Sequence, residues 1–254
     1  MRTRYLSLDA IVLRARPQGE ADAWVTLLAP VAGIISGVAK NGLRSQKRFM
    51  GALMPVTRAD VLLARRQGAW YLEEAEVTRA YRRLKTDVSA YALACYSVEQ
   101  VLQTHPHGPE AADAFPLLAE HLDQLEGGDP DLPLARLAWD LRLMEGLGVA
   151  PHLADCVVCG MEVTARSPAF HGPSGGLLCE DHAAEQSSVL VVQAATVELL
   201  QALLAGERPA AGPRIRKQAR GMTDAHMAWH MPVELRSKRV LEQLSRLSTR
   251  QTRP

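Results

Sequence analysis

The sequence lacks the short motifs by which common enzyme classes are identified. It contains no Gly-x4-Gly-Lys-Ser/Thr phosphate loop, no Gly-x-Ser-x-Gly elbow and no His-Glu-x-x-His helix. Asp155, Glu180 and Asp181 lie near a cysteine pair and suggest a nuclease centre at first sight. Two-metal nucleases, however, use converging carboxylates without thiolates. We therefore expect a protein that is not an enzyme and has no catalytic residues.

Long apolar runs and a secretion signal are also missing. No apolar segment approaches the length that crosses a bilayer, and Met1 to Asp9 has no apolar core of signal-peptide length. We expect a soluble, cytoplasmic protein with no membrane partner, in which disulfide bonds are disfavoured. At 254 residues, the chain is long enough for two domains.

What the sequence does have is a segregation of charge. The formal net charge is only +1, but residues 1–85 contain 15 Lys and Arg against 7 Asp and Glu. Residues 86–210 contain 4 against 18, and residues 211–254 contain 10 against 3. A single charge run usually only solvates a surface, but two basic ends around an acidic middle indicate nucleic-acid binding.

The first part of the chain has the pattern of a small β-barrel. Short apolar runs separated by turn residues predict five strands before residue 81. Strands of this length and spacing favour a closed or nearly closed barrel, which exposes loops and one face to ligands. The expected strands are Tyr5–Arg16, Trp24–Leu28, Ile34–Lys40, Leu53–Ala64 and Trp70–Thr78.

Helical spacing follows, so the fold class is α+β. We expect a barrel domain at residues 1–80 and a helical domain at 81–254, with a metal-binding module inserted at 151–187. The methionine-rich stretch Met222–Met231 is expected to pack in the core or to line a partner groove. The expected helices are Asp87–Pro106, Glu110–Leu125, Leu132–Leu147, Ala194–Leu204 and Pro232–Leu247.

Two ligand pairs with matched spacing predict one metal ion. Cys156 and Cys159 are separated by two residues, as are Cys179 and His182, and nineteen residues lie between the two pairs. Three thiolates and one imidazole can complete a tetrahedron around Zn²⁺, which leaves no open position and indicates a structural site. His171 is an alternative fourth ligand, whereas Cys95 lies in an apolar run and is expected to be a buried thiol.

Cations in the barrel segment predict contacts to phosphates. Phosphate contacts carry no base information, so binding is expected to tolerate any sequence. A second basic cluster comprises Arg214, Arg216, Lys217 and Arg220. The expected nucleic-acid-binding residues are Arg14, Arg16, Lys40, Arg44, Lys47, Arg48, Arg65, Arg66, Arg82 and Arg83.

Aromatic platforms for nucleic-acid bases are scarce, because Phe, Trp and Tyr make up only 5% of the chain. Phe49, within the basic loop, is the best candidate for stacking on a base. Trp24 and Trp70 are expected to belong to the barrel core instead. The scarcity favours tracking of the backbone over tight base stacking.

Several short motifs are informative when their order and spacing are taken together. They are Gly19-Glu20-Ala21-Asp22, Gly33, Ala39-Lys40-Asn41-Gly42 with Arg44 and Arg48, Leu53-Met54-Pro55, Gly146 to Pro151 before the cysteine pairs, and Leu235-Arg236-Ser237. They extend over nearly the whole chain and resemble the RecO family of bacterial recombination mediators. His182 stands where the commoner family arrangement has a fourth cysteine.

The resemblance implies a fold, a function and partners. It implies an amino-terminal OB-fold, a helical domain with a zinc module, binding of single- and double-stranded DNA, and strand annealing without catalysis. It further implies a nucleoid-associated mediator of gap and double-strand-break repair in a RecFOR-type pathway, which helps to load RecA. The implied partners are a RecR-like protein and the acidic tail of the single-stranded DNA-binding protein.

An acidic tail with an apolar end requires a shallow apolar pocket edged by cations. We place this partner site near the carboxyl end, where Leu235, Val240 and Leu244 accompany Arg236 and Arg239. The same leucines would fit an ordinary helix core equally well. An alternative function is a zinc-stabilised adaptor or regulator that binds protein partners through its helical domain. Salt-dependent binding to oligonucleotides separates the two functions.

Overall fold

The computed structural model describes residues 4–128, 131–163 and 168–251 and has an α+β architecture, with a sheet region followed by a helical region. The chain forms two compact units. The first comprises residues 1–129 together with 235–254, and the second comprises residues 130–234. The expected domain boundary near residue 81 falls inside the first unit and remains a prediction.

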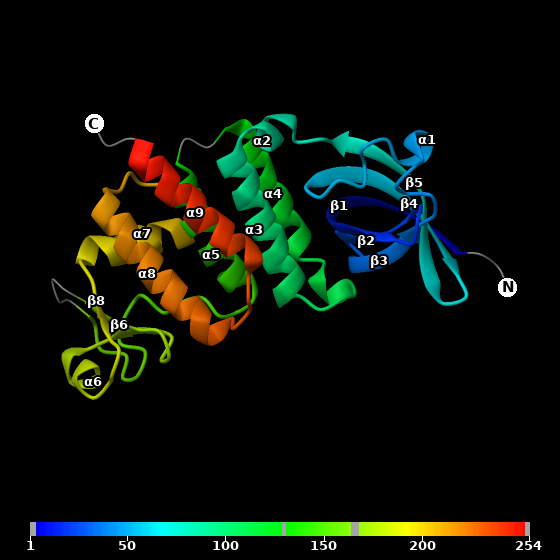
Figure 1. Cartoon of the computed structure of the whole chain (residues 1–254). Helices are drawn as coiled ribbons and strands as arrows, with labels where there is room; N and C mark the ends of the chain where they lie inside the picture. The colour runs from blue at the N-terminus through cyan, green and yellow to red at the C-terminus, as the bar shows by residue number, and fades with distance from the viewer. Residues whose placement is uncertain (1–3, 129–130, 164–167, 252–254) are drawn as a thin grey trace. The chain divides into compact units, whose positions relative to one another are not determined.

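Five strands of the first unit close into a barrel in the order β1-β2-β3-β5-β4 (Figure 1). β1 is long enough to pair with β4 through residues 4–12 and with β2 through residues 11–18. β3 runs antiparallel to β2 and joins β5 in parallel. The strands are β1 (Arg4–Gln18), β2 (Asp22–Ala29), β3 (Gly33–Ala39), β4 (Thr57–Arg66) and β5 (Ala69–Arg79).

Alternation of side chains along each strand fills the barrel. In β2, the side chains of Ala23, Val25 and Leu27 are at most 1% exposed and belong to one core cluster. Because successive strand residues face opposite sides, the residues between them face outward or toward neighbouring elements. The predicted strands are all present, although the fourth begins at Thr57 and not at Leu53. Before it, the short helix α1 (Gln46–Phe49) is followed by turns, and Val56 has a left-handed φ of 58°.

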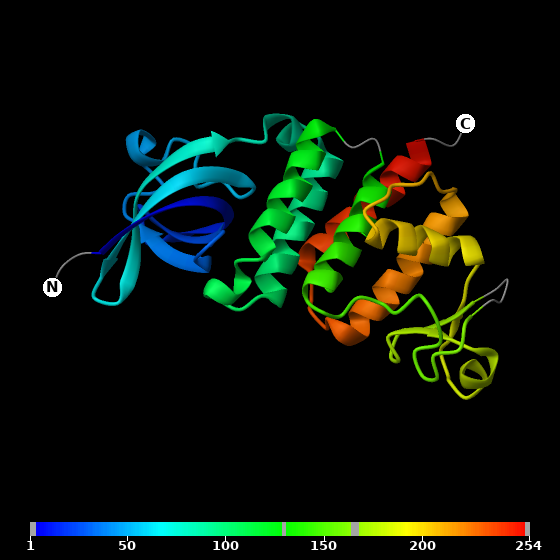
Figure 2. The same cartoon turned by 180° about the vertical axis from the view of Figure 1, so that it is seen from behind.

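Helices complete the first unit. Asp87 explains where α3 begins, because its carboxylate accepts hydrogen bonds from the backbone N–H groups of Ser89 and Ala90. α3 and α4 lie side by side in both views of the molecule, and α9 lies against α3 (Figures 1 and 2). The elements are α2 (Arg82–Thr86), α3 (Val88–Thr104), the 3₁₀ helix η1 (Pro109–Ala111), α4 (Ala114–Gly127) and α9 (Arg236–Gln251).

A side chain from α3 fixes the start of α9. The Glu99 carboxylate accepts hydrogen bonds from the backbone N–H groups of Arg236 and Ser237, at 3.2 and 2.8 Å, and from the Ser237 hydroxyl. An anion at this end also complements the helix dipole. The helix therefore begins at Arg236, four residues later than the sequence pattern predicted, and Leu235 and Leu241 are buried.

The barrel is joined to the helical part of its unit where two stretches of backbone meet closely. Ile34 and Gly108 exchange two backbone hydrogen bonds, at 3.2 and 2.9 Å. Gly33 has a φ of 58°, and a Cβ at this position would lie 1.9 Å from the carbonyl oxygen of Gly108. Only glycine fits here, because a side chain would meet rigid backbone.

The second unit contains three long helices and a small sheet in the order β7-β6-β8. The methionine-rich stretch lies in α8, where Met222 and Met227 are buried, so its expected role in core packing is confirmed. None of the helices in the described ranges has the length and apolar composition of a bilayer-crossing segment. The elements are α5 (Leu132–Gly146), β6 (Ala169–His171), β7 (Gly176–Leu178), α6 (Glu180–Ala184), β8 (Leu190–Val191), α7 (Ala194–Leu204) and α8 (Pro213–His230).

Candidate metal centre and nucleic-acid interface

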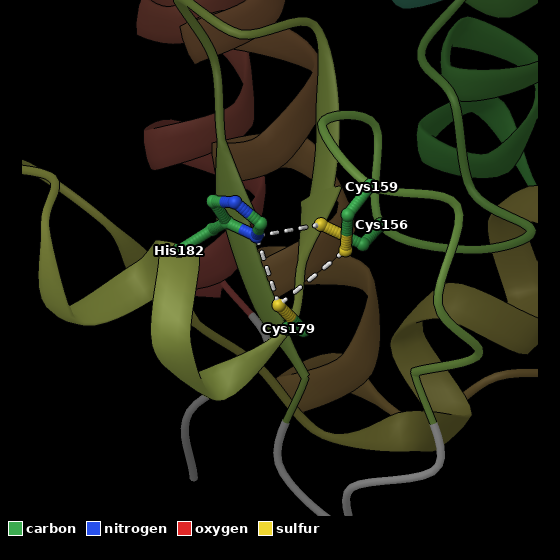
Figure 3. A group of neighbouring side chains, drawn as sticks. All are labelled: Cys156, Cys159, Cys179 and His182. Carbon is green, nitrogen blue, oxygen red and sulfur yellow. Dashed lines mark hydrogen bonds between the residues drawn. The ribbon is translucent and has the colours of Figure 1, made fainter.

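Three thiols and one imidazole meet in the second unit (Figure 3). Cys156 and Cys159 lie on a tight turn, in which the backbone N–H of Cys156 donates to Met161 and that of Gly160 donates back to Cys156. Cys179 follows β7 and precedes α6, which carries His182 one turn later. The four side chains offer ligand atoms that all lie within 4.8 Å of one another.

The distances fit a tetrahedral ion. Ligands bonded to Zn²⁺ at about 2.0–2.3 Å stand roughly 3.5–3.8 Å apart. The Cys156 Sγ lies 3.6 Å from His182 Nδ1, and the sulfurs of Cys159 and Cys179 are 3.9 Å apart. The Cys179 Sγ is closer to His182 Nδ1, at 3.1 Å. The group could therefore hold a metal ion with little movement of its side chains.

Local hydrogen bonds prepare one thiol for ligation. Burial favours the neutral thiol of Cys156, but backbone N–H groups of Cys179, Cys159 and Val158 stabilise the thiolate and lower its pKa to about 6. The pKa of His182 is raised above its usual value, first by its hydrogen bond with the Cys179 sulfur. A cation in the middle of the group would relieve the crowding of these thiolates.

His171, the alternative ligand, lies outside this group. It is buried in β6, and its Nδ1 lies 2.7 Å from the Ser174 hydroxyl. Asp155, one of the carboxylates considered for a nuclease centre, lies 2.6 Å from His152 Nε2. The described ligand group therefore contains His182 and no carboxylate.

Two histidines of α8 that the sequence analysis did not single out contact the backbone before and after the Cys156–Cys159 turn. The Nε2 atoms of His226 and His230 lie 2.6 and 2.9 Å from the carbonyl oxygens of Val149 and Gly172. Their rings stack with centroids 4.3 Å apart. Burial lowers the pKa of His226, which favours its neutral form. Their spacing of four residues on one helix was the available signal in the sequence.

The cations predicted to bind nucleic acid are distributed over several elements of the first unit. Arg14 and Arg16 lie on β1, Arg65 and Arg66 at the end of β4, and Arg82 and Arg83 on α2. Most are exposed, but Arg14 is partly buried, which lowers its pKa. Lys40 follows β3, Arg44 lies in the next turn, and Lys47 and Arg48 lie on α1.

Two cations of the loop between β3 and β4, Lys40 and Arg48, already have partners. Lys40 Nζ lies 2.6 Å from the Asp22 carboxylate while its side chain remains 61% exposed. Arg48 donates a hydrogen bond to the Lys40 carbonyl oxygen and lies over the Phe49 ring. These contacts hold the Lys40 and Arg48 side chains in place within the loop.

The expectations for the aromatic residues were partly wrong. Phe49 is only 2% exposed and belongs to the barrel core, so it is not a stacking platform. Trp24 was expected in the core, but it is 42% exposed, because β2 places Ala23 and Val25 on the inner face. Trp70 does pack against the core, with Arg65 over its ring.

A groove of about 740 Å³ on the barrel surface is lined by groups of both charges. Lys47 and Arg48, from the basic loop, contribute to its lining. The same lining includes the carboxylates of Asp60, Glu74 and Glu76. These carboxylates would repel phosphates, so a nucleic-acid backbone is not expected to follow this groove.

The carboxyl-terminal cations are divided between the units. In the second unit, Arg216 forms an ion pair with Asp131 at 2.7 Å. On α9, Arg236 and Arg239 are exposed. Of the three apolar residues expected at the partner site, Leu235 is buried, Val240 is 48% exposed and Leu244 is partly exposed.

The chain is similar to a known family over most of its length. A family model described as Recombination protein O N terminal matches residues 1–81, and one described as Recombination protein O C terminal matches residues 85–239. A DNA repair protein RecO from Geobacter metallireducens is 34% identical over 239 residues, covering 93% of this chain and 96% of the relative. The corresponding protein from Exiguobacterium sibiricum is 32% identical over 248 residues, covering 94% and 97%.

Proposed function

Because the chain belongs to the RecO family of DNA repair proteins, we propose that it binds and anneals DNA without catalysing a covalent step. The barrel of residues 1–80 is the DNA-binding domain in this proposal, and the helical region presents the protein to its partners. The observation that carries the proposal is the concentration of exposed Lys and Arg on the barrel of a protein from a DNA repair family.

The barrel supports an OB-fold assignment. Its five strands close in the order β1-β2-β3-β5-β4, and β1 takes part in pairs on both sides. OB-folds bind oligonucleotides on one face and between loops. The cations of Lys40, Arg44, Lys47 and Arg48 lie in a connection between strands, where such a ligand could reach them.

We assign Zn²⁺ to Cys156, Cys159, Cys179 and His182, because three soft sulfur ligands and one imidazole favour zinc over a hard ion. A four-ligand site of this kind supplies folding energy and not a reactive water. The ion would hold the Cys156 turn against the start of α6. No catalytic role is required of it.

The proposed partners are a RecR-like protein and the acidic tail of the single-stranded DNA-binding protein. For the tail, we propose Arg236 and Arg239 with the exposed part of Val240. Burial of Leu235 reduces the apolar surface available there. In the cell, these contacts would bring the protein to single strands coated by the single-stranded DNA-binding protein. Annealing and RecA loading take place there in gap and double-strand-break repair.

A salt titration of DNA binding, combined with an annealing assay, tests the proposal. We expect binding to unrelated oligonucleotides with similar affinity, a linear decrease of log K with log salt, and faster annealing of complementary strands. No nucleotide cofactor should be needed. Absence of both binding and annealing at low salt in folded, zinc-loaded protein would overturn the proposal and favour an adaptor that contacts only proteins.

A further inference from the structure

The pairing register of the barrel brings three aromatic residues into one row. Trp24 pairs with Val38, Val38 pairs with Tyr71, Tyr71 with Ala64, and Ala64 with Tyr5. Residues directly opposite each other in paired strands project on the same face of a sheet. The row therefore crosses β2, β3, β5, β4 and β1 on the same surface of the sheet, and because the sheet is closed it runs round the barrel, although its members are far apart in sequence.

This face is the outside of the barrel. Trp24 is 42% exposed and Tyr5 is 58% exposed, while Tyr71 is partly exposed. Their neighbours Ala23, Leu72 and Leu6 belong to the core or pack against it, as alternation requires. Among the aromatic residues that the structure describes, Tyr5, Trp24 and Trp229 are the exposed ones, and two of these three lie in the row.

Short side chains separate the rings. Val38 stands between Trp24 and Tyr71, and Ala64 stands between Tyr71 and Tyr5. Neighbouring strands lie about 4.8 Å apart, so successive rings are separated by roughly 10 Å across the sheet. Val38 and Ala64 are buried beneath the aromatic neighbours. The row thus presents three aromatic rings separated by short side chains, and flat groups can approach these rings.

Cations surround this row. Arg16 pairs directly with Trp24 across β1 and β2, and the Arg66 guanidinium lies 5.6 Å from the centre of the Tyr71 ring. Lys40 also lies near Tyr71. Arg66 is also paired with Glu73 at 2.8 Å, while Arg16 is exposed. Rings flanked by cations suit a ligand that alternates flat bases with phosphates.

We propose that the row of Tyr5, Tyr71 and Trp24 stacks on unpaired nucleobases. This inference rests on the proposed DNA-binding function and adds to it a preference for single strands. Bases of a duplex are already stacked and paired, so their faces are closed to these rings, whereas phosphate contacts serve both forms of DNA. The aromatic row supplies the discrimination between single-stranded and duplex DNA that the basic loop cannot supply.

Substitution of the row by smaller side chains tests this assignment. We expect Trp24→Ala to weaken binding of single-stranded DNA about tenfold and Tyr5→Ala/Tyr71→Ala to weaken it by a comparable factor, as loss of a stacked base does. Binding of duplex DNA should change less than twofold, and Trp24→Phe should retain most of the affinity. Trp229→Ala is a matched control, because Trp229 is 65% exposed in the second unit.

A spectroscopic readout separates stacking from a structural effect. Single-stranded DNA should quench tryptophan fluorescence in the wild-type protein, and Trp24→Phe should remove most of this quenching while thermal unfolding is unchanged. Equal losses for single-stranded and duplex DNA, or unchanged affinity in the Trp24 and tyrosine variants, would overturn the inference while leaving DNA binding itself intact. Failure of the wild-type protein to bind any DNA would instead overturn the proposed function.

Discussion

The barrel and the segment that carries Cys156, Cys159, Cys179 and His182 bring their candidate functional groups together by different means. In that segment, the two members of each candidate ligand pair are separated by two residues, and a single turn or the start of one helix positions both members. On the barrel, the aromatic row is assembled by pairings between five strands. A local site survives changes elsewhere in the fold, whereas a site built by register depends on the whole barrel.

Of the substitutions that test this comparison, removal of one proposed metal ligand should have the largest effect on folding. Cys156→Ser leaves three ligands and should abolish tight zinc binding and unfold the region of residues 151–187, because structural zinc supplies several kcal/mol of folding free energy. Elemental analysis and limited proteolysis measure this. The barrel should retain its DNA affinity, and Cys95→Ser, at a cysteine outside the ligand group, is the control. Folded wild-type protein purified without zinc would contradict the assignment.

A substitution in the barrel should destabilise the first unit and leave the candidate metal site intact. Gly33→Ala places a methyl group against the Gly108 carbonyl and also requires a left-handed alanine, so we expect a loss of about 2–4 kcal/mol in unfolding free energy. Chemical denaturation measures the loss. Zinc content should remain at one per chain. Gly51→Ala is a control of similar φ, 78°, with no neighbouring atom within 4 Å, and should cost less.

Removing charge from the barrel should weaken function and leave both units folded. We expect replacement of Lys40, Arg44, Lys47 and Arg48 by alanine to weaken binding equally for unrelated sequences. The slope of log K against log salt should fall by about 0.7 for single strands and about 0.9 for duplex DNA for each phosphate that the protein no longer neutralises. Unlike the aromatic substitutions, this change should affect single-stranded and duplex DNA alike. Unchanged affinity and slope would exclude the loop as the DNA contact surface, and the basic residues of α8 would become the leading candidate.

A smaller, partner-specific effect is expected at α9. Charge reversal by Arg236→Glu and Arg239→Glu should eliminate binding of a synthetic acidic tail peptide, because its carboxylates lose their cations. Zinc content and DNA binding should be unaffected. Calorimetric titration of the peptide measures the effect, and persistent binding by the folded variant would place the tail site elsewhere.

The smallest expected effect is a pH dependence contributed by His226 of the second unit. Because burial holds the pKa of His226 below its usual value, the unfolded chain binds the proton more tightly. The stabilisation is therefore complete above the unfolded pKa of about 6.5 and decreases as the pH falls toward the lower folded pKa. Thermal unfolding between pH 7.5 and 5 measures it. His226→Gln, which keeps a donor for Val149, should flatten the dependence.

The two regions also differed in what could be predicted from the sequence. Cys156, Cys159, Cys179 and His182 were identified from spacing alone, because neighbouring residues in sequence remain neighbours on a turn or helix. The five strands followed from their apolar runs. The outward position of Trp24 did not, because it depends on which residues of β2 enter the barrel.

Other differences arose from interactions between residues distant in sequence. α9 begins at Arg236 because Glu99, 137 residues earlier, binds its first backbone N–H groups. The basic start of α8 was not recognised as helical, since Arg214, Arg216 and Lys217 concealed its apolar face in the sequence. At the start of α9, the tertiary contact with Glu99 outweighs the local signals on which the prediction of helix ends depends.

The return of α9 to the first unit has a consequence for synthesis on the ribosome. The second unit, residues 130–234, is contiguous and leaves the ribosome before the helix that completes the first unit. Until residues 236 and 237 emerge, Glu99 has no α9 backbone to bind, and the face of α3 that α9 covers stays open. The unit that is translated first is therefore the last to be finished, and a chain that stops at Glu234 leaves it incomplete.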